Sequence, residues 1–250
     1  MHRFFLPPDQ TRGELLALSE EDAHHAARVL RVQLGEPVVV LDGAGGELRC
    51  RVESVGRRDV TVRVTQRVTH PRRAAEVTLV QAIAKTKAMD GILQKSVELG
   101  AARVVPLLAD RSISHPGDAE DKCAKWQIIA TEAAKQSGAA WLTRVEAPLT
   151  PAKWLARGER SDLVLIGSLL DAPQHPRTHF ERFAKEHGRL PRSVAVIVGP
   201  EGDFTPEEYA AFKAAGAKSI TLGPLVLRCE TAATYGLAVV NHELTAPRAG

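Results

Sequence analysis

The chain has 250 residues, of which 44% are hydrophobic and 25% are charged, which excludes a disordered chain, a collagen-like chain and a disulfide-stapled miniprotein. Its net charge of +3 is too small to establish a nucleic-acid partner, and its three cysteines, which form no C-x-x-C pair, argue against disulfides and structural zinc. No apolar run reaches the roughly 18–20 residues of a membrane span and no signal peptide is visible, so we expect a soluble cytoplasmic chain with no membrane and no metal.

The first 75 residues contain twelve arginines and no lysine; the first lysine is Lys85. Because the guanidinium is a planar fork of donors that suits phosphate, a surface rich in arginine indicates contact with phosphate backbones. A genome rich in G and C would produce the same bias, and we give that explanation equal weight.

Up to about residue 68, apolar and polar residues alternate with period two, as in 48–52 and 60–64, with glycine-containing turns at 42–46 and 56–59. This pattern predicts a small antiparallel sheet or barrel over residues 1–73, with a linker at 70–73.

Within that domain, Ser19 is positioned to cap a helix, with Asp22 as its partner three residues on. On such a helix His24, Arg28 and Arg31 are spaced i, i+4, i+7 and share one face, which could contact an RNA backbone together with His25. A solvated basic face is the more ordinary explanation for an isolated motif of this kind. Adjacent histidines point about a third of a turn apart, which disfavours a metal site.

From residue 74 to 250, strand-like apolar runs alternate with helical stretches, which predicts a parallel sheet covered on both faces. We expect strands at 77–84, 103–108, 163–166, 194–198 and 219–222. Thr150-Pro151 and Thr205-Pro206 predict helix starts, the second with Glu208 as a capping box. Glycines that suit helix C′ positions follow the expected helices: Gly100, Gly138, Gly158, Gly188 and Gly216.

Lys85 and Lys87 follow the first of these strands, where ligand-binding loops usually begin, and are candidates for holding phosphate. The next helix is expected to bury Met89, Ile92 and its other apolar residues in the core, so these are not site candidates.

Two late strand-to-helix loops carry the most information. The buried strand at 194–198 runs into Gly199-Pro200-Glu201-Gly202, and the last strand runs into Gly223-Pro224 and an apolar run that ends at Arg228. Such loops let the backbone approach a ligand, and apolar walls with exposed backbone donors suit an adenine ring. The alternative is a pair of ordinary loops. Dinucleotide-binding, P-loop, nucleophile-elbow and metal-ligand motifs are absent, so a nucleotide-like cofactor would bind late in the chain.

Taken in order, these motifs resemble the 16S ribosomal RNA uridine-N3 methyltransferase family over essentially the whole chain. The motifs are Phe4-Phe5, His24-His25 with 28–31, Lys95 with 98–100, Glu132-Ala133 with 136–138, 199–202, and Leu222-Gly223 with 227–232. The resemblance implies a PUA-like β-barrel at 1–73 that binds RNA and an α/β methyltransferase domain of SPOUT type at 74–250. It also implies a C-terminal trefoil knot, a homodimer, S-adenosylmethionine as cofactor, and 16S ribosomal RNA as partner, possibly within the small ribosomal subunit.

Carried over to this chain, the resemblance places the cofactor among three loops. Their residues are Ile166, Gly167 and Ser168; Val198, Gly199, Pro200, Glu201 and Gly202; and Leu222, Gly223, Leu225, Val226 and Leu227. The chain departs from the family pattern at Asp203, where a second glycine is usual, and at residues 139–141, where an arginine is usual.

The expected reaction is methyl transfer to uridine N3, whose proton must leave before the nitrogen is nucleophilic. Arg228 is the candidate that stabilises the anion on the uracil, and Glu230 is the candidate base or orienting group. A helix-start ion pair between the two is the competing explanation. Two other functions stay open: a SPOUT methyltransferase acting on another RNA or position, such as a ribose hydroxyl, and a non-catalytic RNA-binding module.

Overall fold

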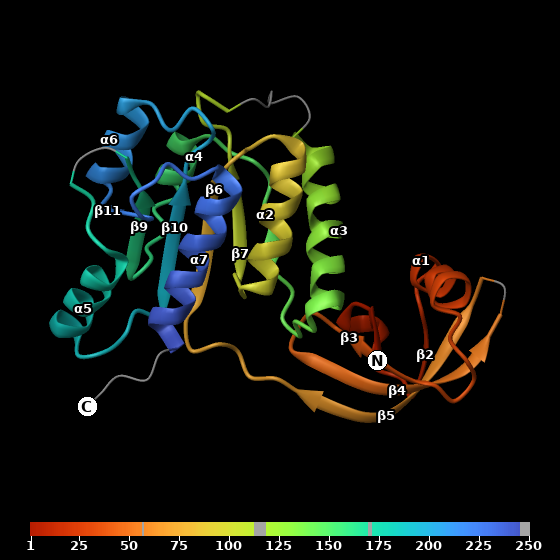
Figure 1. The fold of residues 1–250 in the computed structure, drawn as a ribbon. Coiled ribbons are helices and arrows are strands. Elements are labelled where there is room, and N and C mark those ends of the chain that lie inside the picture. The colour runs from red at the N-terminus through yellow and green to blue at the C-terminus, as the bar shows by residue number, and fades with distance from the viewer. Residues whose placement is uncertain (57, 113–118, 170–171, 246–250) are drawn as a thin grey trace. The chain divides into compact units, whose positions relative to one another are not determined.

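The computed structural model describes residues 1–56, 58–112, 119–169 and 172–245, with no account of side chains at 119–121 (Figure 1). The chain divides into two compact units. The first contains Met1–Arg72 and Thr131–Leu142, and the second contains Arg73–Ala130 and Thr143–Gly250. A segment within the expected methyltransferase domain thus groups with the amino-terminal unit, because it packs there.

The first unit is built on a five-stranded sheet with the strand order β1-β3-β4-β5-β2. The strands are β1 (His2–Phe5), β2 (Leu15–Ala17), β3 (Pro37–Leu41), β4 (Gly46–Val55) and β5 (Val60–Thr69), and a short 3-10 turn, η1, spans Pro8–Gln10. The expected antiparallel pairing holds for every pair except β1 with β3, which is parallel. The alternation correctly places Leu48, Cys50, Val52, Val60 and Val62 in the core of this unit.

The predicted continuous helix at 20–31 is wrong in its second half. The α-helix α1 (Glu20–His24) gives way to a π-helix, η2 (His25–Leu30), and Arg31 follows with a left-handed backbone at φ 53°. Because a π-helix has i to i+5 hydrogen bonds and Arg31 leaves the helix with a left-handed backbone, the α-helical i, i+4, i+7 spacing does not hold for His24, Arg28 and Arg31.

Ser19 caps α1 as predicted, since its Oγ accepts a hydrogen bond from the Asp22 amide at 3.2 Å. Asp22 is thus the partner of Ser19 through its amide, while its carboxylate has other partners. The carboxylate accepts from the Phe5 amide at 3.1 Å and from Lys135 Nζ at 2.7 Å. Burial and these contacts make Asp22 a link between β1 and the residues 131–142 of the same unit.

The second unit is a six-stranded sheet with the order β11-β9-β10-β6-β7-β8, parallel at every pair as predicted. Its strands are β6 (Glu76–Ala82), β7 (Arg103–Leu107), β8 (Arg144–Val145), β9 (Leu163–Gly167), β10 (Ser193–Val198) and β11 (Lys218–Ile220). β8 is the strand that the hydrophobic pattern did not predict.

The helices of the second unit are α2 (Thr86–Glu98), α4 (Pro151–Ala156), α5 (Pro176–His187), α6 (Pro206–Ala214) and α7 (Cys229–Thr245). A further helix, α3 (Ala119–Ser137), begins in this unit and ends in the first. α7 packs against the central strands β10 and β6 and against α2, as Figure 1 shows. The helix ends follow the sequence signals: Thr150 and Thr205 cap α4 and α6, the latter with the full capping box. All five predicted C′ glycines have positive φ.

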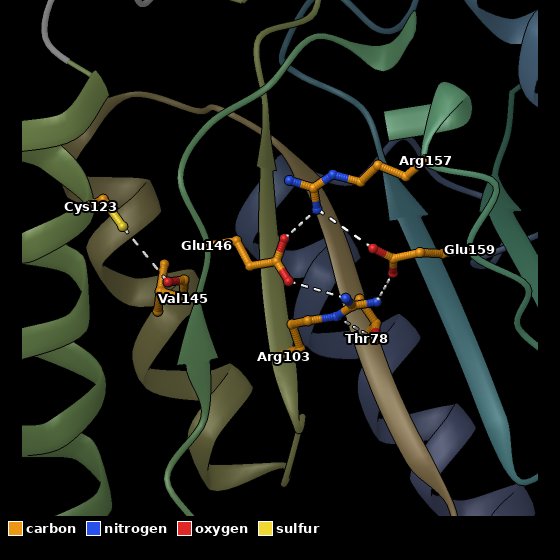
Figure 2. Close-up of polar contacts among 7 residues, drawn as sticks. All are labelled: Thr78, Arg103, Cys123, Val145, Glu146, Arg157 and Glu159. Atoms are coloured by element: carbon orange, nitrogen blue, oxygen red, sulfur yellow. Dashed lines mark hydrogen bonds and ion pairs between the residues drawn. The ribbon is translucent and has the colours of Figure 1, made fainter. Parts of the chain in front are cut away.

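Charged side chains at the amino-terminal ends of the strands of the second unit form a closed network (Figure 2). Glu146 is buried and accepts from Arg103 at 3.1 Å and from Arg157 at 2.6 Å, while Glu159 accepts from Arg103 at 2.6 Å. The hydrogen bond from Arg103 holds the pKa of Glu159 below its usual value. Nearby, Arg189 pairs with both oxygens of Asp162 at 2.7 and 3.2 Å.

Among the described residues, no helix is both long and apolar enough to cross a membrane. No group of three or more His, Cys, Asp or Glu side chains in that part of the chain could hold a metal ion.

Candidate functional site

A pocket of about 590 Å³ opens at the carboxyl-terminal ends of the parallel strands of the second unit. Because these ends meet at one edge of the sheet, loops that are distant in sequence converge there. The pocket is lined by the loops that follow β6, β9, β10 and β11 and by the first turn of α7.

Most of the predicted cofactor residues line this pocket together. They are Gly167, Ser168, Val198, Gly199, Pro200, Glu201, Leu222, Gly223, Leu225, Val226 and Leu227, and the candidate catalytic residues Arg228 and Glu230 join them. The two late loops of the sequence and the loop at 167–168 therefore form one site.

Two predicted cofactor residues do not line the pocket. Ile166 is fully buried and packs in the core between the sheet and its helices. Gly202 lies against Arg111, which donates to its carbonyl oxygen at 2.9 Å. Residues that were not among the predicted site residues also line the pocket: Ala88, Leu169, Asp203, Cys229 and Ala232. Each is within two residues of a predicted site residue, so the sequence located the loops but not every inward-facing position.

The loop at 223–227 presents apolar side chains and backbone donors to the pocket. Leu225 and Val226 are 73% and 77% exposed, although both are large apolar residues. In the part of the chain that the structure describes, the amides of Leu225, Val226 and Leu227 donate to no protein group. Gly223 has φ +111°, and a Cβ there would meet no protein atom within 4 Å. Free donors between apolar walls fit a flat heteroaromatic ligand such as adenine.

Charged groups of both signs surround the pocket. Glu201 accepts from the Lys85 amide at 3.2 Å, so it ties the loop after β10 to the start of α2. Cys229 is buried at the pocket wall; burial raises the pKa of its thiol, and the charges of Glu201, Glu230 and Asp203 raise it further, to about 11. This thiol is therefore protonated and is not a nucleophile at neutral pH.

Arg228, the residue before α7, is exposed. It has no ion pair or side-chain hydrogen bond within the described residues. The competing explanation, an ion pair between Arg228 and Glu230, is therefore not found in this structure. A guanidinium without an internal partner is available to a ligand.

The predicted RNA-binding residues are divided. His24, His25, Arg28 and Arg31 are all exposed, in the first unit. Lys85 lines the pocket of the second unit, whereas Lys87, the second residue of α2, is exposed and does not line it. Only Lys85 therefore takes part in the site described above.

Comparison with known proteins matches this architecture along its length. A family model described as an RNA methyltransferase domain matches residues 71–241, and one described as an RNA methyltransferase PUA domain matches residues 18–65. Proteins named ribosomal RNA small subunit methyltransferase E are among the relatives. The one from Synechocystis is 32% identical over 96% of this chain and 77% of its own length. That from Mycobacterium tuberculosis is 31% identical over 95% of this chain and 90% of its own.

Solved structures agree with these sequence matches. A methyltransferase from Legionella pneumophila in complex with S-adenosylmethionine superposes with a TM-score of 0.85 at 30% identity and covers 96% of both chains. The ribosomal RNA small subunit methyltransferase E of Neisseria gonorrhoeae, bound to S-adenosylmethionine, gives 0.83 at 28% identity, again over 96% of both chains. With a PUA-like unit followed by a parallel sheet whose loops build this pocket, the chain belongs to the SPOUT-type RNA methyltransferase family that includes ribosomal RNA small subunit methyltransferase E.

Proposed function

We propose that this chain transfers a methyl group from S-adenosylmethionine to N3 of a uridine in 16S ribosomal RNA. The observation that carries the proposal is the pocket at the carboxyl-terminal edge of a parallel sheet. There the backbone amides at 225–227 lie between apolar walls and donate to no group among the described residues. Relatives of this chain are named as small-subunit ribosomal RNA methyltransferases, or have been solved with S-adenosylmethionine.

The pocket residues fit this cofactor in size and chemistry. Its volume lies within the range of about 300–1,000 Å³ found for small-molecule sites. Gly223 leaves the backbone accessible, and the apolar residues of the loops after β10 and β11 would enclose the adenine. When bound, S-adenosylmethionine supplies an electrophilic methyl group; the chain supplies binding and orientation.

Arg228 and Glu230 have the reactive roles in this proposal. Uridine N3 carries a proton at neutral pH, and its departure leaves negative charge on the uracil oxygens. The unpaired guanidinium of Arg228 stabilises that charge, and Glu230 accepts or orients the proton. Because N3 lies on the pairing edge of the base, the target uridine must be unpaired or extruded.

The exposed basic residues of the first unit, His24, His25, Arg28 and Arg31, contact the RNA backbone in this proposal, and Lys85 and Lys87 hold phosphate near the pocket. A trefoil knot of the cofactor loops, a homodimer, a division of the chain into domains at residue 73 and action in the cytoplasm belong to the same proposal. The substrate in this proposal is 16S ribosomal RNA, either free or assembled into the small ribosomal subunit.

Cofactor binding tests the proposal first. Titration of the protein with S-adenosylmethionine should give a Kd of micromolar order, roughly −8 kcal/mol. Gly223→Val should weaken binding at least about 100-fold, because it places a branched side chain in the pocket at a φ of +111°. Gly158→Val is the matched control, since Gly158 also has positive φ and open space but lies outside the pocket, and it should leave the Kd unchanged.

Mapping the methylated nucleotide tests the substrate. Incubation with 16S ribosomal RNA and with small subunits, followed by mass analysis of nucleosides, should give 3-methyluridine. A 2′-O-methylated nucleoside or modification of another RNA would refute the N3 assignment, and the lack of cofactor binding even with RNA present would refute the enzymatic function.

A further inference from the structure

Carboxylates outnumber cationic side chains around the pocket. Glu201 and Asp203 come from the loop after β10 and Glu230 from the first turn of α7, whereas the cationic residues that line the pocket are Lys85 and Arg228. The Lys85 amide already donates to Glu201, which fixes one carboxylate in place. The lining therefore has a formal excess of negative charge.

Asp203 is held at the wall of the pocket by its own backbone. Its φ of 58° is in the left-handed region, where asparagine and aspartate are tolerated better than most residues. In this conformation its Oδ1 accepts from the next amide, that of Phe204, at 2.8 Å. The same oxygen lies 2.8 Å from where a Cβ would stand on Gly199. The carboxylate is thus folded over the first residue of the cofactor loop.

The thiol of Cys229, at the same wall of the pocket, is affected by these carboxylates. Burial is the main reason that the pKa of Cys229 is raised to about 11, and the carboxylates of Glu201, Glu230 and Asp203 add to it. The part of this rise that the three carboxylates cause, unlike the part that burial causes, has the sign that favours a cation at the same place. A cavity of about 590 Å³ is only about 10 Å across, no more than a Debye length, so a charge anywhere inside it is subject to the field of these carboxylates.

We propose that Asp203 is a specificity-determining residue that makes the pocket prefer the cationic methyl donor to its neutral product. The inference rests on the proposed function. In the reaction, the electron pair of the sulfur–methyl bond stays on sulfur, so the sulfonium becomes the neutral thioether of S-adenosylhomocysteine. N3 of uridine, having lost its proton to a base, forms the new bond to carbon. The attraction to Asp203 is lost with the methyl group, which favours exchange of product for fresh donor.

Asp203→Asn tests this directly, because asparagine retains the size, the tolerance of left-handed φ and the acceptor for the Phe204 amide but removes the charge. Calorimetric titration should show S-adenosylmethionine binding weakened about 5–10-fold, with S-adenosylhomocysteine changed less than about twofold, as expected for one charge in a partly screened site. The difference should shrink in high salt. Glu186→Gln, at an exposed position of α5 outside the pocket, should change neither affinity.

A second variant, Asp203→Gly, also removes the carboxylate and suits the left-handed backbone. It should show the same shift in the ratio of the two affinities, and it keeps the test valid if Asp203→Asn does not fold. Equal weakening of both ligands, or no change in either, would overturn the role of Asp203 while leaving cofactor binding intact. Failure of the unmodified protein to bind S-adenosylmethionine would instead refute the proposed function and this inference with it.

Discussion

The two edges of the parallel sheet in the second unit use their arginines in opposite ways. At the amino-terminal edge, Arg103 is the first residue of β7 and Arg157 is the C-cap of α4. Both form ion pairs with carboxylates in the network of Figure 2. Arg189 pairs with Asp162, one residue before β9, and its guanidinium also lies over the ring of Phe183 at 5.3 Å. Every one of these charges is satisfied within the protein.

At the carboxyl-terminal edge, the described structure offers Arg228 no such partner, and Leu225 and Val226 are exposed. Unpaired donors and exposed apolar side chains do not stabilise a fold, so their concentration at one edge indicates a surface arranged for ligands. Both edges of this sheet are charged. The amino-terminal edge, where the charges are paired, stabilises the fold, whereas the carboxyl-terminal edge, where Arg228 has no partner among the described residues, is arranged for ligands.

Arg228→Ala should have the largest effect and should act on the reaction alone. Loss of one donor to a developing anion lowers rates by roughly 10²–10³, so the single-turnover rate of RNA methylation should fall by that factor. Arg228→Lys should recover only part, because lysine lacks the planar fork, and higher pH should partly rescue the alanine variant. The melting temperature should be unchanged.

Arg160→Ala, at an exposed arginine outside the pocket, is the control and should retain the full rate. If Arg228→Ala kept a rate within a few-fold of the unmodified protein, Arg228 would not be catalytic and the contrast between the edges would lose its functional meaning.

Glu146→Gln should act on stability alone. It removes the buried charge that joins Arg103 to Arg157, and we expect a loss of about 2–3 kcal/mol in the free energy of unfolding. The loss is below that of a fully buried pair because the arginines are partly exposed. Urea denaturation measures it, with Glu159→Gln, at a 39% exposed side chain, as a control expected to cost under about 1 kcal/mol. A changed Kd for S-adenosylmethionine would show that the two edges are coupled.

Asp162 should give the smallest effect, visible as a dependence of stability on pH. Hydrogen bonds from Arg189 and from the Arg192 amide lower its pKa from 3.8 to about 2. The folded state therefore binds this proton less readily than the unfolded state, so the stabilisation is complete above pH 4 and is lost as the pH falls towards 2.

Asp162→Asn should cost about 1 kcal/mol at neutral pH and flatten the acid limb of the stability curve measured by thermal unfolding. Glu207→Gln, at an exposed residue in the first turn of α6, should leave that limb unchanged. An identical acid limb in Asp162→Asn would mean that the ion pair with Arg189 contributes nothing measurable.

The buried strands and the helix ends could be predicted because their causes are local. The apolar run at 194–198 and the Thr205-Pro206 cap each depend on neighbouring residues, and both appear as expected. The pocket loops could also be predicted, since glycine and proline after buried strands are a local signal. Ile166, which the family resemblance placed among the cofactor loops, lies in the core and not in the pocket lining. Because β9 is buried over most of its length, alternation does not reveal which of its residues faces a ligand.

Other features depend on contacts distant in sequence. β8 has two residues, Arg144 and Val145, and forms because they pair with the start of β7. The Asp22 carboxylate binds Lys135, which is 113 residues away in sequence, and the second half of the helix predicted through residue 31 is a π-helix, with Ala26 and Val32 packed into the core. No pattern within residues 19–31 contains that information.

The division of the chain also constrains how the protein is made. The first unit includes Thr131–Leu142, so its amino-terminal strands are synthesised well before the segment that completes them. The 70 residues from 73 to 142 must follow Arg72 out of the ribosome, which takes about 4–14 s at the usual elongation rate of roughly 5–20 residues per second. During that interval Asp22 lacks Lys135 and the sheet lacks its packing partner, so the growing chain has a defined period in which this unit is unfinished and open to chaperones.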